Sequence, residues 1–220
     1  MRMRGNEAIS GEVGAQDVPA KTGIWHHPGG KLVENGAHSL TQAELLAILL
    51  GAGIPGKSAL DIANTILDEY VGLYWLHTKG SIKKLAAFSG VGQRKAARIY
   101  AAIELGRILY SGKNNGNSKE IKQDENELFF HKSEPDIPED KKRNGNVDDA
   151  RLISTIIGSG IKGHSANEIA NDLLTRFGSF RDLYDKDMGE FRKIKGLDSV
   201  KIIRIAAALE IAKRLAQAIS

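Results

Sequence analysis

The chain carries two copies of one sequence pattern, and this repeat limits its possible folds more than any other feature. GAGIPGKSALDIANTIL at 51–67 aligns without gaps to GSGIKGHSANEIANDLL at 158–174, with ten of 17 positions identical. Further along, LAAFSGVGQRKAARIYAAIELGRIL at 85–109 aligns to FRKIKGLDSVKIIRIAAALEIAKRL at 191–215, with eight of 25 identical. The offsets are 107 and 106 residues. Two blocks in the same order indicate a duplicated domain, with copies at about 40–111 and 148–219.

Apolar residues recur within each copy at the spacing of α-helices. Thr41-Gln-Ala-Glu44 has the form of a capping box ahead of the apolar run LLAILL. Residues 58–70 place their apolar side chains on one helical face, and a longer inner stripe follows Gly92. ARLISTII, before Gly158, is more typical of a strand, but no long stretch alternates with period two. We therefore predict an all-α protein.

The segment between the copies has a different composition. It is rich in Lys, Glu, Asp and Asn and has few apolar residues, so it cannot bury enough surface to offset the entropy of ordering. We predict an arm in which Trp25 packs on the first copy. The predicted organisation is a disordered N-terminus at 1–24, a first domain at 25–111, a flexible linker at 112–147 and a second domain at 148–220.

The stretch GAGIPGKS at 51–58 fits the phosphate-binding loop of nucleotide triphosphatases, G-x-x-x-x-G-K-[ST]. A true loop of that kind joins a buried strand to a helix. Here the preceding run has the cap of a helix, and the second copy has His164 in place of the lysine. No later strand ends in a magnesium-binding aspartate. We therefore favour a turn between two helices over an ATP site.

A glycine turn between helices can hold a phosphate in another way. Glycine permits positive φ, and the turn presents the unpaired N–H groups and positive dipole end of the next helix. FSGVGQRKA at 88–96 has this form, with Gln93, Arg94 and Lys95 on the first turn. In the second copy Asp198 replaces the second glycine, and we predict that it caps its own helix and repels a phosphate.

The first copy closely resembles the N-terminal helical region of the RadC family. The motifs are ELLAILLGAG, GKSALDIA and AAIELGR, within about residues 25–110, and the second copy resembles the same module more distantly. The resemblance implies a tandem helix–hairpin–helix domain in each copy. The residues that we predict to contact DNA phosphates are Gly51, Gly53, Gly56, Lys57, Ser58, Gly90, Gly92, Gln93, Arg94, Lys95, Gly158, Gly160, Lys162, Gly163, His164 and Ser165.

RadC proteins continue into a JAB/MPN domain with a zinc site that contains an H-x-H motif, and this sequence has no H-x-H. We therefore do not carry over a metal-dependent activity. The adjacent His26 and His27 have no third ligand nearby, and no nucleophile–base arrangement stands out. We expect no enzyme activity, no metal and no cofactor.

The net charge of +4 and the absence of cysteine fit a cytoplasmic protein, associated with the nucleoid if the source is prokaryotic, without a membrane segment. We predict sequence-nonspecific binding of duplex or branched DNA, in DNA repair or recombination. The alternative is a scaffold that dimerises or holds a DNA-processing partner. Phe129 and Phe130, after an acidic stretch of the linker, are candidates for docking to a protein partner.

Overall fold

The computed structural model describes residues 27–111 and 149–219, and helices are the only extended regular elements in these ranges. Two isolated bridges, within 54–57 and 161–164, are the only β-type pairings there. The predicted all-α class is confirmed for the described part of the chain. In order, the elements are α1 (Pro28–Asn35), η1 (Ala37–Ser39), α2 (Gln42–Leu50), α3 (Ala59–Tyr70), α4 (Leu73–Lys79), α5 (Ile82–Ala86), α6 (Gly92–Ser111), α8 (Asp149–Ile157), α9 (Ala166–Phe177), η3 (Asp182–Asp185), α10 (Met188–Phe191) and α11 (Ser199–Ile219).

The predicted capping box starts α2. The Glu44 amide donates to the Thr41 hydroxyl at 3.2 Å, and the Thr41 amide donates to the Glu44 carboxylate at 2.7 Å. Reciprocal bonds of the same kind start α3 and α9. Each box satisfies two amides that the helix itself cannot pair, so local sequence defines where these helices begin.

ARLISTII, whose composition suggested a strand, lies in α8. Its side chains at 152, 153, 156 and 157 are buried, which is the spacing of one helical face. Burial against neighbouring helices therefore overrides the strand preference of its isoleucines. Both segments ahead of the glycine turns are helices, so neither turn follows the strand that a nucleotide-binding loop requires.

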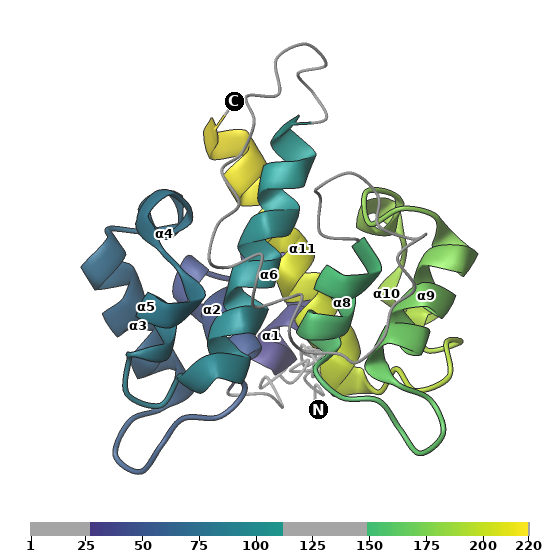
Figure 1. Cartoon of the computed structure of the whole chain (residues 1–220), viewed down its shortest axis with the longest axis horizontal. Coiled ribbons are helices and arrows are strands. Elements are labelled where there is room, and N and C mark those ends of the chain that lie inside the picture. Colours follow the sequence, from purple (N-terminus) through teal and green to yellow (C-terminus); the bar gives the residue numbers. More distant parts are fainter. Residues whose placement is uncertain (1–26, 112–148, 220) are drawn as a thin grey trace, which may run out of the picture.

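The two longest helices, α6 and α11, pack side by side in the centre of the molecule, and the remaining helices flank them on either side (Figure 1). The predicted inner stripes of both helices are buried. The contact is close at Gly106, where an added Cβ would lie 2.9 Å from Leu215 Cβ and 3.1 Å from Ala212 O. A larger residue there would have to push the two helices apart.

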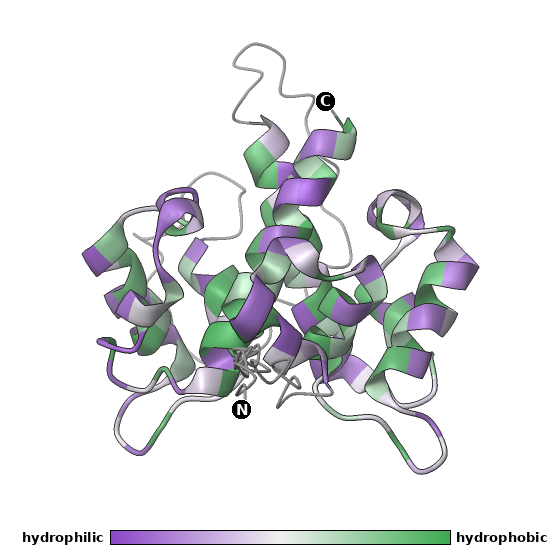
Figure 2. Cartoon of the chain, turned by 180° about the vertical axis from the view of Figure 1, so that it is seen from behind, coloured by the Kyte–Doolittle hydropathy of each residue, from purple (hydrophilic) through white to green (hydrophobic). Residues whose placement is uncertain are grey.

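The two copies are joined by more than this central pair. Helix α6 also packs on α8, and α11 packs on α2, so one hydrophobic cluster runs through both copies. Arg181 donates to Ile108 O at 2.9 Å, and Arg214 donates to His38 O at 3.2 Å, each from the second copy to the first. Figure 2 shows hydrophobic residues gathered where the helices face one another. Below, residues 27–111 are called the first half and 149–219 the second half.

Several predictions concern residues outside the described ranges. These are the disordered 1–24, the flexible 112–147, the packing of Trp25 and the docking of Phe129 and Phe130. The division into two domains also stays a prediction, although the described halves share one core.

Candidate functional site

The first glycine turn, residues 51–58, ends α2 and leads into α3. Gly51 and Gly56 have φ of 76° and 79°, a range that favours glycine. Gly53 leaves no space for a side chain, because an added Cβ would lie 2.1 Å from Lys57 O. The Ile54 and Lys57 amides donate to each other's carbonyls at 2.9 and 3.0 Å, which closes the loop.

The turn at 158–165 has the same geometry. Gly158 and Gly163 have φ of 85° and 75°, and an added Cβ on Gly160 would lie 2.2 Å from His164 O. Ile161 and His164 exchange amide bonds at 2.8 and 3.0 Å. Both loops project from the same end of the molecule, which is also where α6 and α11 begin (Figure 1). The sequence repeat is thus a repeat of backbone conformation.

Ser58 and Ser165, both predicted to hold phosphate, cap the helices that follow. Their hydroxyls accept from the Asp61 and Glu168 amides at 3.1 and 3.2 Å. Hydrogen bonds from Ser58, first from its hydroxyl and then from its amide, lower the pKa of Asp61. The backbone amide of Ser165 lowers the pKa of Glu168 in the same way. An ionised carboxylate therefore lies at each helix start, which counts against phosphate contact by these two serines.

The cations of the two loops differ in their surroundings. Lys57 and Lys162 are exposed. His164, which aligns with Lys57, lies 2.9 Å from a carboxylate oxygen of Asp172. Lys57 and Lys162 are thus the loop side chains that remain best placed for an anion, whereas His164 already contacts an acid.

The turn ahead of α6 combines a packing glycine with an open one. An added Cβ on Gly90 would lie 2.8 Å from the Ile62 side chain, so this glycine allows the turn to sit on α3. Gly92 has φ of 61° and no neighbouring atom within 4 Å of an added Cβ. Gln93 and Arg94 are exposed on the first turn of α6. The start of α6 therefore faces open space and has the exposed positive charge of Arg94 beside it.

Lys95, also predicted to bind phosphate, ties the two turns of the first half together. Its ammonium donates to Ala52 O at 2.6 Å and to Gly90 O at 2.7 Å. Burial, together with nearby Arg98, lowers its pKa. Lys201, the equivalent residue, donates to Gly196 O at 2.7 Å. Both lysines therefore use their donors internally, and the geometry disfavours Lys95 as a phosphate ligand.

The turn ahead of α11 supplies its own acceptor. Asp198 Oδ1 accepts from the Lys201 amide at 2.9 Å, so the predicted self-capping is confirmed. Asp198 also lies 3.7 Å from the Lys201 ammonium and is 61% exposed. A phosphate approaching this helix start would meet a carboxylate.

Sequence reasoning did not select Arg98 and Arg204, which reach the junction between the halves. Arg98 donates from Nη1 to Leu49 O at 2.6 Å, and Arg204 donates to Ile157 O at 3.3 Å. They are identical residues at the 106-residue offset. That identity was the available signal, but nothing in the local pattern placed the two guanidinium groups together.

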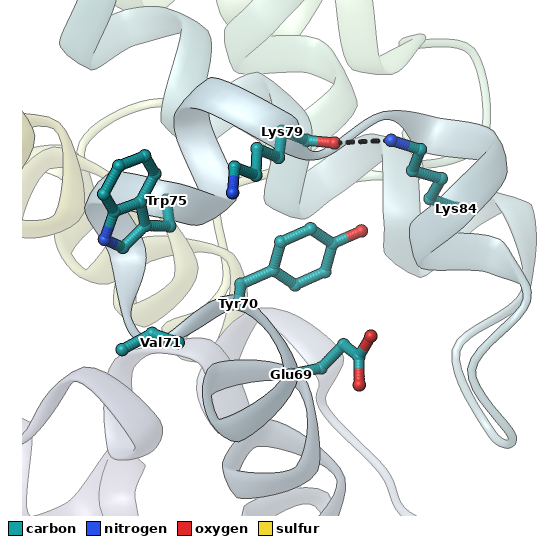
Figure 3. A pocket seen from close by; sticks show the side chains of 6 residues that line it. All are labelled: Glu69, Tyr70, Val71, Trp75, Lys79 and Lys84. Carbon is teal, nitrogen blue, oxygen red and sulfur yellow. Dashed lines mark hydrogen bonds between the residues drawn. The ribbon is translucent and has the colours of Figure 1, made fainter.

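A separate pocket of about 360 Å³ lies between α3, α4 and α5, and its lining residues fall between the two turns of the first half in sequence. Figure 3 shows it between Tyr70, Trp75 and the two lysines 79 and 84, with Lys84 donating to Lys79 O at 2.9 Å. Val71 beside it is 78% exposed and has φ of 56°, while Tyr74 and Trp75 are 43% and 42% exposed. This is an exposed apolar patch at a strained backbone position.

Among the described residues, no three His, Asp or Glu side chains cluster in a way that could hold a metal. Every helix in the described ranges is too short or too polar to span a membrane.

These features define a helical protein with repeated glycine turns, and sequence comparison assigns it to a family. The profile of the UPF0758 N-terminal family matches residues 24–97 and again 141–203, so the chain belongs to this RadC-like family. UPF0758 proteins of Carboxydothermus hydrogenoformans and Desulforudis audaxviator are 43% and 48% identical over 96 and 80 residues. These matches cover 41% and 36% of this chain.

UPF0758 protein YsxA of Bacillus subtilis is 38% identical over 95 residues, or 43% of this chain. The matches span only 40%, 34% and 39% of the lengths of these three relatives. No solved structure matches the chain. The comparisons thus give the family, and the relatives' names state no activity.

Proposed function

We propose that the chain is a non-enzymatic protein that grips the DNA phosphate backbone without reading its sequence. In this proposal the four glycine turns are helix–hairpin–helix motifs, arranged as a tandem pair in each half, and the halves arose by duplication. The observation that carries the proposal is the pair of exposed loops of equal geometry that project from one end of the molecule, beside the open start of α6 (Figure 1).

The chemistry of that end suits a nucleic-acid backbone. Exposed amides at the start of a helix and the positive end of its dipole attract phosphate oxygens. Lys57, Arg94 and Lys162 add exposed positive charge around them. Contacts of this kind position a protein on DNA but carry no base information. The shared core of the halves would present both loops to one DNA molecule as a single surface.

Fluorescence anisotropy tests the proposal with single-stranded, duplex and junction DNA of equal length. We expect affinity to fall as salt rises, with a log–log slope of about −0.9 for each phosphate neutralised on duplex DNA. A salt-independent affinity, or no binding below about 100 μM at low salt, would contradict it. A second assay incubates intact, damaged and branched DNA with the protein and divalent metal. Recovery of all three substrates without cleavage would support a non-enzymatic role.

The alternative function, a protein-interaction scaffold, is favoured by the exposed patch of Val71, Tyr74 and Trp75. Dimerisation through the inner stripe of α6 is disfavoured, because this stripe already packs on α11. A scaffold would therefore use the patch. Sedimentation of wild type and Trp75→Ala separates the cases, since self-association that the substitution abolishes supports the scaffold.

A place in DNA repair or recombination follows from the resemblance alone. Partner docking through Phe129 and Phe130 concerns residues outside the described ranges.

A further inference from the structure

The junction between the halves brings two equivalent arginines together. Arg98 lies in the second turn of α6 and Arg204 in the second turn of α11, the pair of helices that forms the centre of the molecule (Figure 1). Each guanidinium is held by a carbonyl of its own half, Leu49 O for Arg98 and Ile157 O for Arg204. These carbonyls belong to the last turns of α2 and α8, directly ahead of the two exposed loops.

Each arginine also reaches the loop of the opposite half. Arg98 Nη2 lies 2.8 Å from the position that a Cβ on Gly158 would take, and Arg204 Nη2 lies 3.5 Å from the same position on Gly51. Both glycines are exposed. The two guanidinium groups therefore lie between the loops, at the end of the molecule where the proposed DNA contacts lie.

The positive charge at this junction is poorly balanced. Neither guanidinium takes part in an ion pair, and the Nε of each is buried without a hydrogen-bond partner within the described ranges. Burial and then Arg204 lower the pKa of Arg98 to about 10. Burial also lowers the pKa of Arg204, and Asp198 opposes this. Half-buried like charges are unfavourable without a counter-ion, and Asp198 supplies one only near Arg204, so an anion would further relieve the junction.

The junction is open to solvent on at least one side. Arg204, but not Arg98, lines an open groove of about 460 Å³ together with Gly51 and Ser58, and apolar residues form most of the groove's wall. Arginine presents several N–H donors in a planar fork that matches the oxygens of a phosphate. We propose that Arg98 and Arg204 together bind a phosphate group of the DNA backbone between the two loops. This inference rests on the proposed DNA binding and adds its central contact.

The first test measures duplex affinity against salt for wild type, Arg98→Gln, Arg204→Gln and the double variant. Lys83→Gln, an exposed residue of α5, is the control with the same change of charge. We expect the double variant to lose about tenfold or more in affinity. We also expect its salt slope to be smaller by about 1, while the control stays close to wild type. Arg98→Lys keeps the charge and loses the fork, so it should retain the slope and bind more weakly.

The second test needs no DNA. Inorganic phosphate should raise the Tm of the wild-type protein in a saturable way, as a ligand of the folded state does. The double variant should lose this rise. If the glutamine variants fail to fold, Arg98→Lys and Arg204→Lys replace them, and the expected result is a weaker phosphate effect.

The outcomes separate the two proposals. A folded double variant that binds DNA with wild-type affinity and slope overturns the arginine site and leaves DNA binding in place. A wild-type protein that ignores DNA but shows a phosphate effect dependent on both arginines overturns the proposed function and keeps the site. Equal phosphate effects in wild type and double variant count against the site.

Discussion

The two halves share one backbone plan but differ in what they place at the start of their longest helix. In the first half, Gly92 opens α6 and leaves space in front of it. In the second half, Asp198 occupies the equivalent position and accepts a hydrogen bond from α11. The comparison teaches that two turns with the same backbone can offer different surroundings to an anion. One helix start can receive a ligand, whereas the other supplies its own carboxylate.

The same contrast extends to the loops. Both are closed by the same pair of amide bonds, but Lys57 is exposed while its counterpart His164 contacts Asp172. The loop of the first half thus has an exposed cation at a position where the second half has a histidine in contact with an acid. The loop backbone is common to both halves, and their surface chemistry differs.

The largest expected effect tests whether the loop geometry matters equally in both halves. Gly53→Ala and Gly160→Ala should each lower the free energy of unfolding by about 3 kcal/mol, because the new Cβ would collide with a backbone carbonyl. Gly56→Ala and Gly163→Ala are matched controls with open space, and positive φ alone should cost about 1 kcal/mol. Urea denaturation measures all four. A large loss of stability in the variants of only one half would show that the two loops do not share the same constraint.

The second prediction exchanges the residues that distinguish the helix starts. Gly92→Asp should lower DNA affinity about tenfold, since it places a carboxylate where a phosphate would bind. Aspartate tolerates the positive φ of this position better than most residues. Asp198→Gly should raise affinity by a smaller factor. Anisotropy with duplex DNA is the measurement, and Gly92→Asn, which adds a similar volume without charge, is the control for the first exchange.

Two results would weaken the contrast between the halves. Equal losses in Gly92→Asp and Gly92→Asn would mean that shape rather than charge decides. An affinity unchanged in Asp198→Gly would mean that the second half makes no backbone contact through α11, which fits a role in supporting the first half.

Local chemistry explains which parts of this arrangement were predictable. The capping box at Thr41 and the cap at Asp198 join residues three apart, so their sequence spacing is sufficient to predict them. The bond from Lys95 to Ala52 spans 43 residues. It forms only because the two turns of the first half pack together. Lys95 was predicted to be a phosphate ligand because the sequence alone does not show that the carbonyls of Ala52 and Gly90 surround its ammonium.

The sequence did not predict the contact between the two halves, for a similar reason. The apolar stripe of α6 was predicted correctly, but periodicity does not say what covers a stripe. Its partner is α11, about a hundred residues later in the chain. Treating the copies as separate domains therefore hid the position of Arg98 and Arg204 between them.

The third prediction concerns Val71, whose counterpart is Gly178. Both residues end a helix with positive φ, but a β-branched side chain is strained there. Val71→Gly should stabilise the protein by about 1 kcal/mol, since the side chain is 78% exposed and buries little. Thermal unfolding measures the change. Gly178→Val should destabilise, because its Cβ would lie 2.5 Å from Asp182 Oδ2.

A loss of stability in Val71→Gly would mean that the valine packs better than its exposure suggests. A variant that is more stable but self-associates less would mean that the strained Val71 contributes to an interaction surface, as the scaffold alternative requires.

The smallest expected effect is a pH dependence of stability that only the first half contributes. His77 in α4 aligns with Tyr184, whose hydroxyl donates to Leu209 O at 2.5 Å. His77 Nδ1 is instead buried without a partner in the described structure. Burial lowers the pKa of His77, Glu104 raises it and Arg107 lowers it further. Burial followed by Glu210 raises the pKa of Tyr184, so the tyrosine stays neutral at any pH near 7.

Because the folded protein disfavours protonated His77, the unfolded chain binds that proton more readily. Stability contributed by His77 is therefore present above about pH 6.5 and is lost as the pH falls through the lowered pKa of the folded state. The loss should stay below about 1 kcal/mol, since the site is only partly shielded from solvent. Tm measured from pH 7 to 5 should fall less steeply in His77→Gln than in wild type. Tyr184→Phe should lower the Tm by a similar amount at each pH, and equal slopes in all three proteins would contradict a titrating group confined to the first half.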